Sequence, residues 1–205
     1  MTFNEGMRID TSSVGSSGGH GRGIAIGGGV GGLVIMLIAL FLGVDPGPAL
    51  QQTAVPTQSQ PGFDLAQCKT GADANKFAEC RVVATTNSLD GIWSQLLKGY
   101  RKPRTQLFTG QVQTGCGAAD SDVGPFYCPA DQTAYFDVGF FDVLKDEFGS
   151  SGGPLAQEYV VAHEYGHHVQ NLTGDLSRSQ KGANGATGGG VRSELQADCS
   201  AGAWA

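Results

Sequence analysis

The segment that most constrains the fold of this chain is residues 163–167, whose sequence HEYGH has the pattern H-E-x-x-H. Two histidines four residues apart share one face of an α-helix, so both imidazoles can reach one metal ion if this stretch is helical. Glu164 projects from nearly the same face, where its carboxylate can deprotonate a water molecule at the metal. The pattern is typical of zinc peptidases, and it predicts His163 and His167 as metal ligands and Glu164 as the catalytic base.

The residues around this pattern predict the limits of the helix. Pro154 suits a first helical position, and Gly174 suits the position just after the end. The apolar residues 160–162 indicate that the helix enters a core. Gly166 costs up to about 1 kcal/mol relative to alanine within a helix, but its missing side chain allows another segment to pack closely.

A third ligand is expected downstream, because a catalytic zinc ion takes three protein ligands and keeps a fourth position for water. Glu194 is the best candidate, in the sequence ELQAD of residues 194–198, where apolar positions predict a second buried helix. Asp198 lies four residues further on the same face. We expect it to accept a hydrogen bond from the outer ring nitrogen of a ligand histidine and so to orient the ring. The alternative is a solvated acidic edge.

Residues 163–171 (HEYGHHVQN) and 194–199 (ELQADC) together resemble the "putative neutral zinc metallopeptidase" family of bacterial membrane-anchored proteins. Residues 100–103 (YRKP) and 124–131 (GPFYCPAD) are also similar to that family. The resemblance implies an α+β fold with a zincin-like domain, in which a small sheet accompanies the H-E-x-x-H helix and the Glu-x-x-x-Asp helix. It implies glutamate as the third zinc ligand. It also implies a domain that continues beyond residue 205, so we expect the domain to be incomplete at its C-terminus.

The N-terminal third of the chain predicts a membrane anchor. Residues 1–23 are polar and rich in serine and glycine, and we expect a disordered tail. Residues 24–43 carry no charge over a length sufficient to cross a bilayer, which predicts a transmembrane helix over 24–44. A cleaved signal peptide is the alternative, but no small-x-small cleavage site follows. The Pro- and Gln-rich residues 45–63 predict an extended linker, which leaves 64–205 as the zinc metallopeptidase domain.

The basic residues predict the orientation of that anchor. Arg8 and Arg22 precede the apolar run, and no lysine or arginine follows it until Lys69. The positive-inside rule then places the N-terminus in the cytoplasm and the catalytic domain outside, extracellular or periplasmic, in a single-pass protein of the cell membrane. The net charge of −6 and the lack of a basic stripe argue against nucleic acid as a partner. The expected partners are the membrane and a peptide or protein substrate.

The cysteines favour an oxidising compartment. Cys116 and Cys128 flank a loop of Gly, Ala, Asp and Pro and are predicted to form a disulfide, and Cys68 and Cys80 are a possible second pair. Cys199 is left over, either as a buried thiol or as the partner of a cysteine further along a longer chain. A Cys-rich zinc site is the rival interpretation, but no C-x-x-C pair occurs.

Other elements are predicted from local patterns. Asn87 or Ser88 is predicted to cap a helix through Gly99, whose buried stripe is Ile92, Trp93, Leu96 and Leu97. Strands are expected over 106–114 and 132–138, a short helix over 140–148, and a mobile loop over 173–192. The resemblance implies that residues 134–138 are an edge strand that binds extended substrate. An ordinary strand of the sheet is the alternative.

Together these features predict a membrane-anchored zinc metallopeptidase, a hydrolase with Zn²⁺ as cofactor. His163, His167 and Glu194 would hold the ion, and Glu164 would accept the proton of the attacking water. Two alternatives stay open. One is a non-catalytic, membrane-tethered zinc-binding module, which would not need Glu164. The other is a zinc amidohydrolase that acts on a non-peptide amide.

Overall fold

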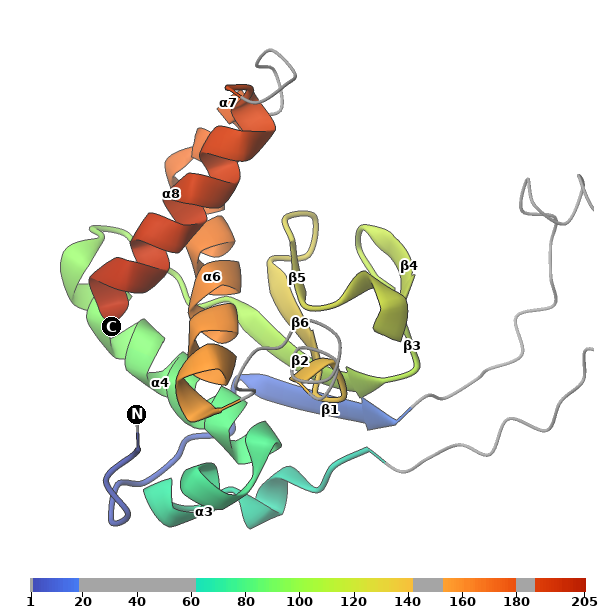
Figure 1. Ribbon diagram of the computed structural model, residues 1–205, viewed down its shortest axis with the longest axis vertical. Helices are drawn as coiled ribbons and strands as arrows, with labels where there is room; N and C mark the ends of the chain where they lie inside the picture. The colour runs from blue at the N-terminus through green and yellow to red at the C-terminus, as the bar shows by residue number, and fades with distance from the viewer. Residues whose placement is uncertain (1, 19–61, 142–152, 180–186) are drawn as a thin grey trace, which may run out of the picture. The chain divides into compact units, whose positions relative to one another are not determined.

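The computed structural model describes residues 2–18, 62–141, 153–179 and 187–205, and these form a mixed α+β domain, as predicted (Figure 1). Within these ranges no helix is both long enough and apolar enough to cross a membrane. The predicted transmembrane helix over 24–44 lies outside the described residues. So do residues 45–61 of the predicted linker and most of the predicted helix over 140–148.

A four-stranded sheet has the order β1-β2-β6-β5. Strands β1 (Val14–Gly18), β2 (Arg104–Thr109) and β6 (Thr133–Asp137) are parallel, and β5 (Phe126–Cys128) pairs antiparallel with β6. The strand predicted over 132–138 is therefore confirmed as β6. This order makes β5 one edge of the described sheet and places β6 in its interior.

The strand predicted over 106–114 is two strands instead of one. Gly110 has a φ of 79°, a left-handed conformation that glycine adopts without strain, and the chain turns there. The residues that follow form a separate antiparallel hairpin of β3 (Gln111–Thr114) and β4 (Gly117–Asp120). The 3-10 helix η2 (Ser121–Val123) then leads to β5.

Three long helices, α4 (Ala78–Leu96), α6 (Pro154–Thr173) and α8 (Gly189–Trp204), lie together beside the sheet (Figure 1). Helix α6 begins at Pro154 and ends before Gly174, whose φ is 78°, so both predicted limits are confirmed. The loop predicted over 173–192 is wrong in part, because α7 (Asp175–Ser179) and the first turn of α8 occupy it. The short elements η1 (Leu65–Gln67) and α3 (Gly71–Lys76) precede α4.

The predicted start of a helix at Asn87 or Ser88 is wrong, because α4 already begins at Ala78. Asn87 does not cap a helix. Its amide donates to the carbonyl of Asp10 (2.9 Å) and accepts from the N–H of Asp10 (2.7 Å). The predicted buried stripe is wrong at Leu96, which is 64% exposed. The buried residues of α4 lie earlier and are Cys80, Arg81, Val82, Val83, Ala84, Thr85, Thr86, Leu89 and Asp90.

Residues 2–18, which we call the N-terminal arm, are part of the domain, so the prediction of a disordered tail over 1–23 is wrong for this stretch. β1 pairs with β2 over its whole length. Asn75 exchanges two hydrogen bonds with the backbone of Phe3, at 2.8 and 2.9 Å. The N–H of Gly71 donates to the carbonyl of Met7. Hydrogen bonds to its main chain order the arm, and Val14 also packs into the main core.

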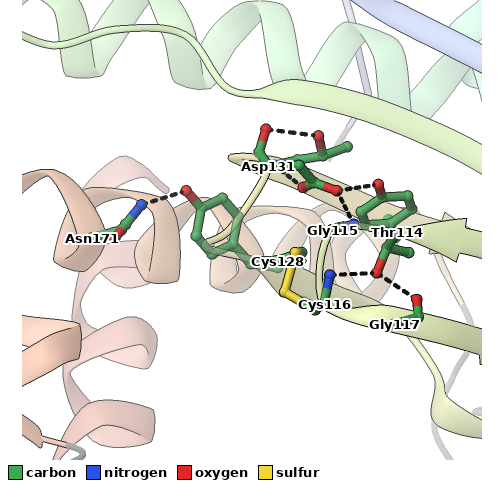
Figure 2. Close-up of a disulfide and its surroundings, with 10 residues drawn as sticks. Thr114, Gly115, Cys116, Gly117, Cys128, Asp131 and Asn171 are labelled. Carbon is green, nitrogen blue, oxygen red and sulfur yellow. Dashed lines mark hydrogen bonds between the residues drawn. A yellow bond between two sulfur atoms is a disulfide. The ribbon is translucent and has the colours of Figure 1, made fainter.

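Both expected disulfides are present. Cys68–Cys80 joins the end of η1 to α4, and Cys116–Cys128 joins the β3–β4 turn to the end of β5 (Figure 2). Cys199 is exposed, so its interpretation as a buried thiol is wrong. The main core lies where α4 and α6 meet the sheet, and its most buried members include Val83, Leu89, Phe136 and Tyr165.

Candidate active site

The predicted ligands come together where α6 and α8 pack closely. A Cβ atom added to Gly166 would lie 2.9 Å from both the Cα and the carbonyl oxygen of Ala197, so the glycine permits this approach. Across the contact, Glu194 Oε2 lies 3.1 Å from His163 Nε2 and 3.4 Å from His167 Nε2. One ligand atom from each of the three residues lies within 4.8 Å of the other two.

The outer nitrogen of His163 faces Asp198. The distance from His163 Nδ1 to Asp198 Oδ1 is 2.9 Å, which is the contact that the sequence predicts. The Tyr159 hydroxyl also donates to Asp198 Oδ1, and the pKa of the Asp198 carboxyl is lowered first by this hydrogen bond and also by that of His163. The same contact raises the pKa of Tyr159 to about 12. Because an ionised carboxylate only accepts, Nδ1 of His163 carries the hydrogen.

The outer nitrogen of His167 faces Gln170, a residue that the sequence analysis missed. His167 Nδ1 lies 2.9 Å from Gln170 Oε1. The amide orientation is determined by its other end, since Nε2 lies 2.6 Å from the carbonyl oxygen of Ser193 and must donate to it. Gln170 follows His167 by three residues on one helix, and this spacing is the signal that could have revealed it.

These hydrogen bonds leave both histidines with bare Nε2 atoms when the rings are neutral. The two lone pairs then point toward the Glu194 carboxylate, so three electron-rich atoms converge without a hydrogen between them. A cation among them removes that repulsion. Two imidazole nitrogens and one carboxylate oxygen are donors typical of catalytic zinc sites, so the residues present fit a zinc ion.

Glu164 lies beside these ligands and is 7% exposed. Burial raises the pKa of its carboxyl, while His167, His163 and a hydrogen bond from the backbone N–H of Tyr127 act in the opposite direction. A raised pKa makes the carboxylate a better proton acceptor. It faces a cleft of about 480 Å³ whose lining is Pro125, Phe126, Tyr127, Pro129, His163, Glu164, His167, Leu176 and Glu194.

The expectation that residues 134–138 form the substrate-binding edge strand is wrong. They form β6, which pairs with β2 on one side and with β5 on the other, so its main chain is already hydrogen-bonded in the sheet. The edge strand beside the cleft is β5, and both Phe126 and Tyr127 line the cleft. With only three residues, β5 is too short to show a strand periodicity in the sequence.

Comparisons with known proteins identify the family of the chain. A model of the family described as "Putative neutral zinc metallopeptidase" matches residues 4–205. An uncharacterized protein of Mycobacterium bovis is 65% identical over 208 residues, which cover 100% of this chain and 71% of the relative. The uncharacterized protein YpfJ of Escherichia coli K12 is 37% identical over 205 residues, which cover 92% of this chain and 68% of the relative. No solved structure matches the chain.

The family match extends well beyond the ligand helices. It includes most of the N-terminal arm as well as β2, the β3–β4 hairpin and β5. A match of this extent, together with two bacterial relatives at these identities, shows that the chain belongs to the putative neutral zinc metallopeptidase family.

Proposed function

We propose that the chain is a zinc-dependent peptidase with a zincin-like domain, which hydrolyses peptide bonds in the cleft between α6, α8 and β5. One observation carries the proposal: the Nε2 atoms of two histidines and the Glu194 carboxylate converge beside the buried side chain of Glu164. A zinc site that serves only structure has no need of a buried, uncoordinated glutamate with a raised pKa at its side.

His163, His167 and Glu194 would hold the ion, and zinc in such a site lowers the pKa of water and polarises a carbonyl group. The hydrogen bonds of Asp198 and Gln170 hold the two imidazole rings with Nε2 toward the ion. Glu164 accepts a proton from the attacking water as the new C–O bond forms at the peptide carbonyl. It then donates this proton to the amine nitrogen as the C–N bond breaks.

The substrate is an extended peptide. Strand β5 is an edge of the described sheet and lines the cleft, so a peptide can add to it through main-chain hydrogen bonds. Such pairing would place the peptide chain alongside Glu164, which lies next to the backbone of Tyr127. The lining residues from 125 to 129 are prolines and aromatics, which favours apolar side chains in the substrate.

We also propose that the domain acts outside the cytoplasm. The two disulfides support this location, because such bonds persist in oxidising compartments and are rare in the reducing cytosol. Attachment to the membrane through residues 24–44 remains a prediction from the sequence.

The test combines the zinc content of the purified chain with hydrolysis of a mixed peptide library. The variant is Glu164→Gln, which keeps the shape of the side chain and removes its basicity. Glu158→Gln is the matched control, since Glu158 is a buried glutamate on the same helix that does not line the cleft. We expect about one zinc ion per chain in all three proteins, and cleavage by the wild type and by Glu158→Gln only.

Each other outcome has a definite meaning. Undiminished cleavage by Glu164→Gln would exclude Glu164 as the base. Zinc without peptide cleavage in the wild type would favour a binding module, or an amidohydrolase if a non-peptide amide is hydrolysed. A wild-type chain that holds no zinc would contradict the proposed metal site.

A further inference from the structure

We propose that Tyr127, His168 and Asn171 form a clamp that positions β5 for peptide binding, so that Tyr127 is a positioning residue of the substrate site. The inference rests on the proposed function, because it takes β5 as the strand to which the substrate adds. All three residues lie within the motifs at 124–131 and 163–171, but the sequence analysis assigned none of them a role in the site. Tyr127 lies on β5, while His168 and Asn171 follow the second ligand histidine on α6.

The hydrogen bonds of the clamp have one consistent direction. His168 Nε2 lies 2.6 Å from the carbonyl oxygen of Arg101, which only accepts, so Nε2 carries a hydrogen. Nδ1 of the neutral ring is then an acceptor, and the Tyr127 hydroxyl donates to it at 2.9 Å. The phenol oxygen in turn accepts from Asn171 Nδ2 at 2.9 Å. The hydroxyl of Tyr127 therefore both donates to α6 and accepts from it.

This group joins three parts of the domain at the edge of the cleft. The His168 ring is fully buried and connects α6 with the segment before β2, through the Arg101 carbonyl. The Tyr127 side chain is 9% exposed, while its backbone N–H reaches Glu164. The phenol thus determines how far the main chain of β5 stands from the helix that carries the ligands and the base.

The other side chains of β5 are held from the opposite face of the sheet, since side chains alternate along a strand. Phe126 stacks on Tyr135, with ring centroids 4.9 Å apart. Cys128 is bonded to Cys116 of the neighbouring turn. Figure 2 shows this disulfide, with Asn171 at the left of the view. With all three side chains fixed, the outer main-chain edge of β5 is ordered before a peptide arrives.

A strand that is ordered in advance loses less conformational freedom when it binds. Loosening it should therefore weaken peptide binding and leave the chemical step largely unchanged. A residue with a purely structural role would instead lower the thermal stability without a selective effect on peptide affinity.

The experiment compares Tyr127→Phe with Tyr135→Phe in the zinc-loaded full chain. Tyr135 is the matched control because its hydroxyl donates to Asp131 at 2.7 Å on the other face of the sheet. Each change removes one hydroxyl and one donated hydrogen bond, and Tyr127→Phe also removes the bond accepted from Asn171. Asn171→Ala is a second variant that removes the donor to Tyr127. Hydrogen exchange of the amides of residues 126–128 reports the order of β5, and KM, or the Kd of an uncleaved peptide, reports binding.

We expect faster exchange at the amides of residues 126–128 in Tyr127→Phe and Asn171→Ala than in Tyr135→Phe. We also expect KM for peptides that span β5 to rise about tenfold with kcat changed less than about twofold, as for a loss of uniform binding. Equal exchange in the two Tyr→Phe variants would overturn the clamp. Faster exchange with unchanged KM and peptide Kd would overturn its role in substrate binding. A wild type that binds peptides without cleaving them counts against the proposed function alone, because exchange and Kd still test the clamp.

Discussion

The two ligand histidines differ in the group that orients them. His163 donates its outer hydrogen to the Asp198 carboxylate, whereas His167 donates to the uncharged amide of Gln170. A negative partner makes the imidazole a stronger donor to a cation than a neutral partner does. The side chain of Asp198 is nevertheless 44% exposed, so solvent screens part of this effect.

Replacing Asp198 with asparagine should weaken zinc binding by roughly 10- to 100-fold, because the amide oxygen still orients His163 but carries no charge. Competition with a chromogenic chelator measures this change. Tyr159→Phe is the control, as it removes the tyrosine hydrogen bond and keeps the carboxylate. An affinity loss as large as that of Asp198→Asn in this control would mean that orientation, and not charge, is the contribution of Asp198.

At the residue scale, the sequence predicted those site residues whose positions depend only on the geometry of one helix or of two helices. The spacing of His163, Glu164 and His167 needs only helical geometry, and the site residues Glu194 and Asp198 followed from a second helix with the same spacing. Tyr127 was not predicted, because its role depends on where a three-residue strand lies in the fold. Local patterns carry no information about such a contact.

At the scale of elements, the distance between α6 and α8 determines whether Glu194 can reach the histidines. Gly166 is a point of close approach and lies between the two ligand histidines of α6. Glycine is a weak helix former because it lacks a side chain, and at this position the same lack allows the two helices to pack closely.

Gly166→Ala should destabilise the domain by about 1–3 kcal/mol, because the new methyl group would overlap the backbone of Ala197. Thermal unfolding measures this loss, and zinc affinity should fall with it as Glu194 moves away. Gly202→Ala on α8 has open space around the added carbon and should stabilise the helix by about 0.5–1 kcal/mol. A Gly166→Ala variant as stable as the wild type would contradict the close packing.

The two disulfides provide a second test at this scale, because each closes a loop with a sequence separation of 12. Equal loops predict equal stabilisation, about 3 kcal/mol each if the stabilisation is entropic. Replacing both cysteines of either pair with serine should therefore lower the midpoint of unfolding by similar amounts. Only the loss of Cys116–Cys128, which holds β5, should also raise KM for peptides. Equal KM changes in both variants would contradict this difference.

A helix boundary was predicted correctly where the residue at the boundary sets it through its own conformation. It was missed where the boundary depends on a distant part of the chain. Gly174 ends α6 through its own conformation. Asn87 has the composition of a helix cap, but its side chain pairs with the backbone of the N-terminal arm, and α4 continues through it. β1 has the sequence VGSSG, which has a low strand propensity, and only its pairing with β2 makes it a strand.

At the scale of the whole molecule, the N-terminal arm is built into the domain at several separate points. It contributes β1, one of the two outer strands of the described sheet. Asn75 of α3 and Asn87 of α4 each donate a hydrogen bond to its backbone and accept one from it. A chain without residues 2–18 would expose β2 and leave the amides of Asn75 and Asn87 without these partners.

The arm and the domain should react with a membrane-impermeant thiol reagent from the same side of the membrane. Cys199 is an exposed native thiol on the domain. Ser12→Cys, in a Cys199→Ser background, provides the matching probe on the exposed part of the arm. Labelling of both thiols in intact cells, or of neither, would agree with the pairing of β1 with β2. Labelling of Cys199 alone would agree with the expected cytoplasmic N-terminus and would mean that β1 is not paired in the cell.

The pairing of β1 with β2 also requires both strands to lie on the same side of any membrane. Hydrogen-bonded strands lie about 5 Å apart, whereas the hydrocarbon layer of a bilayer is about 30 Å thick, so lipid cannot separate the two strands. If the domain is exported, as its disulfides support, the residues of the arm are exported with it. Folding of the domain is then completed only after the arm and the ligand helices, which lie far apart in the sequence, have reached one compartment.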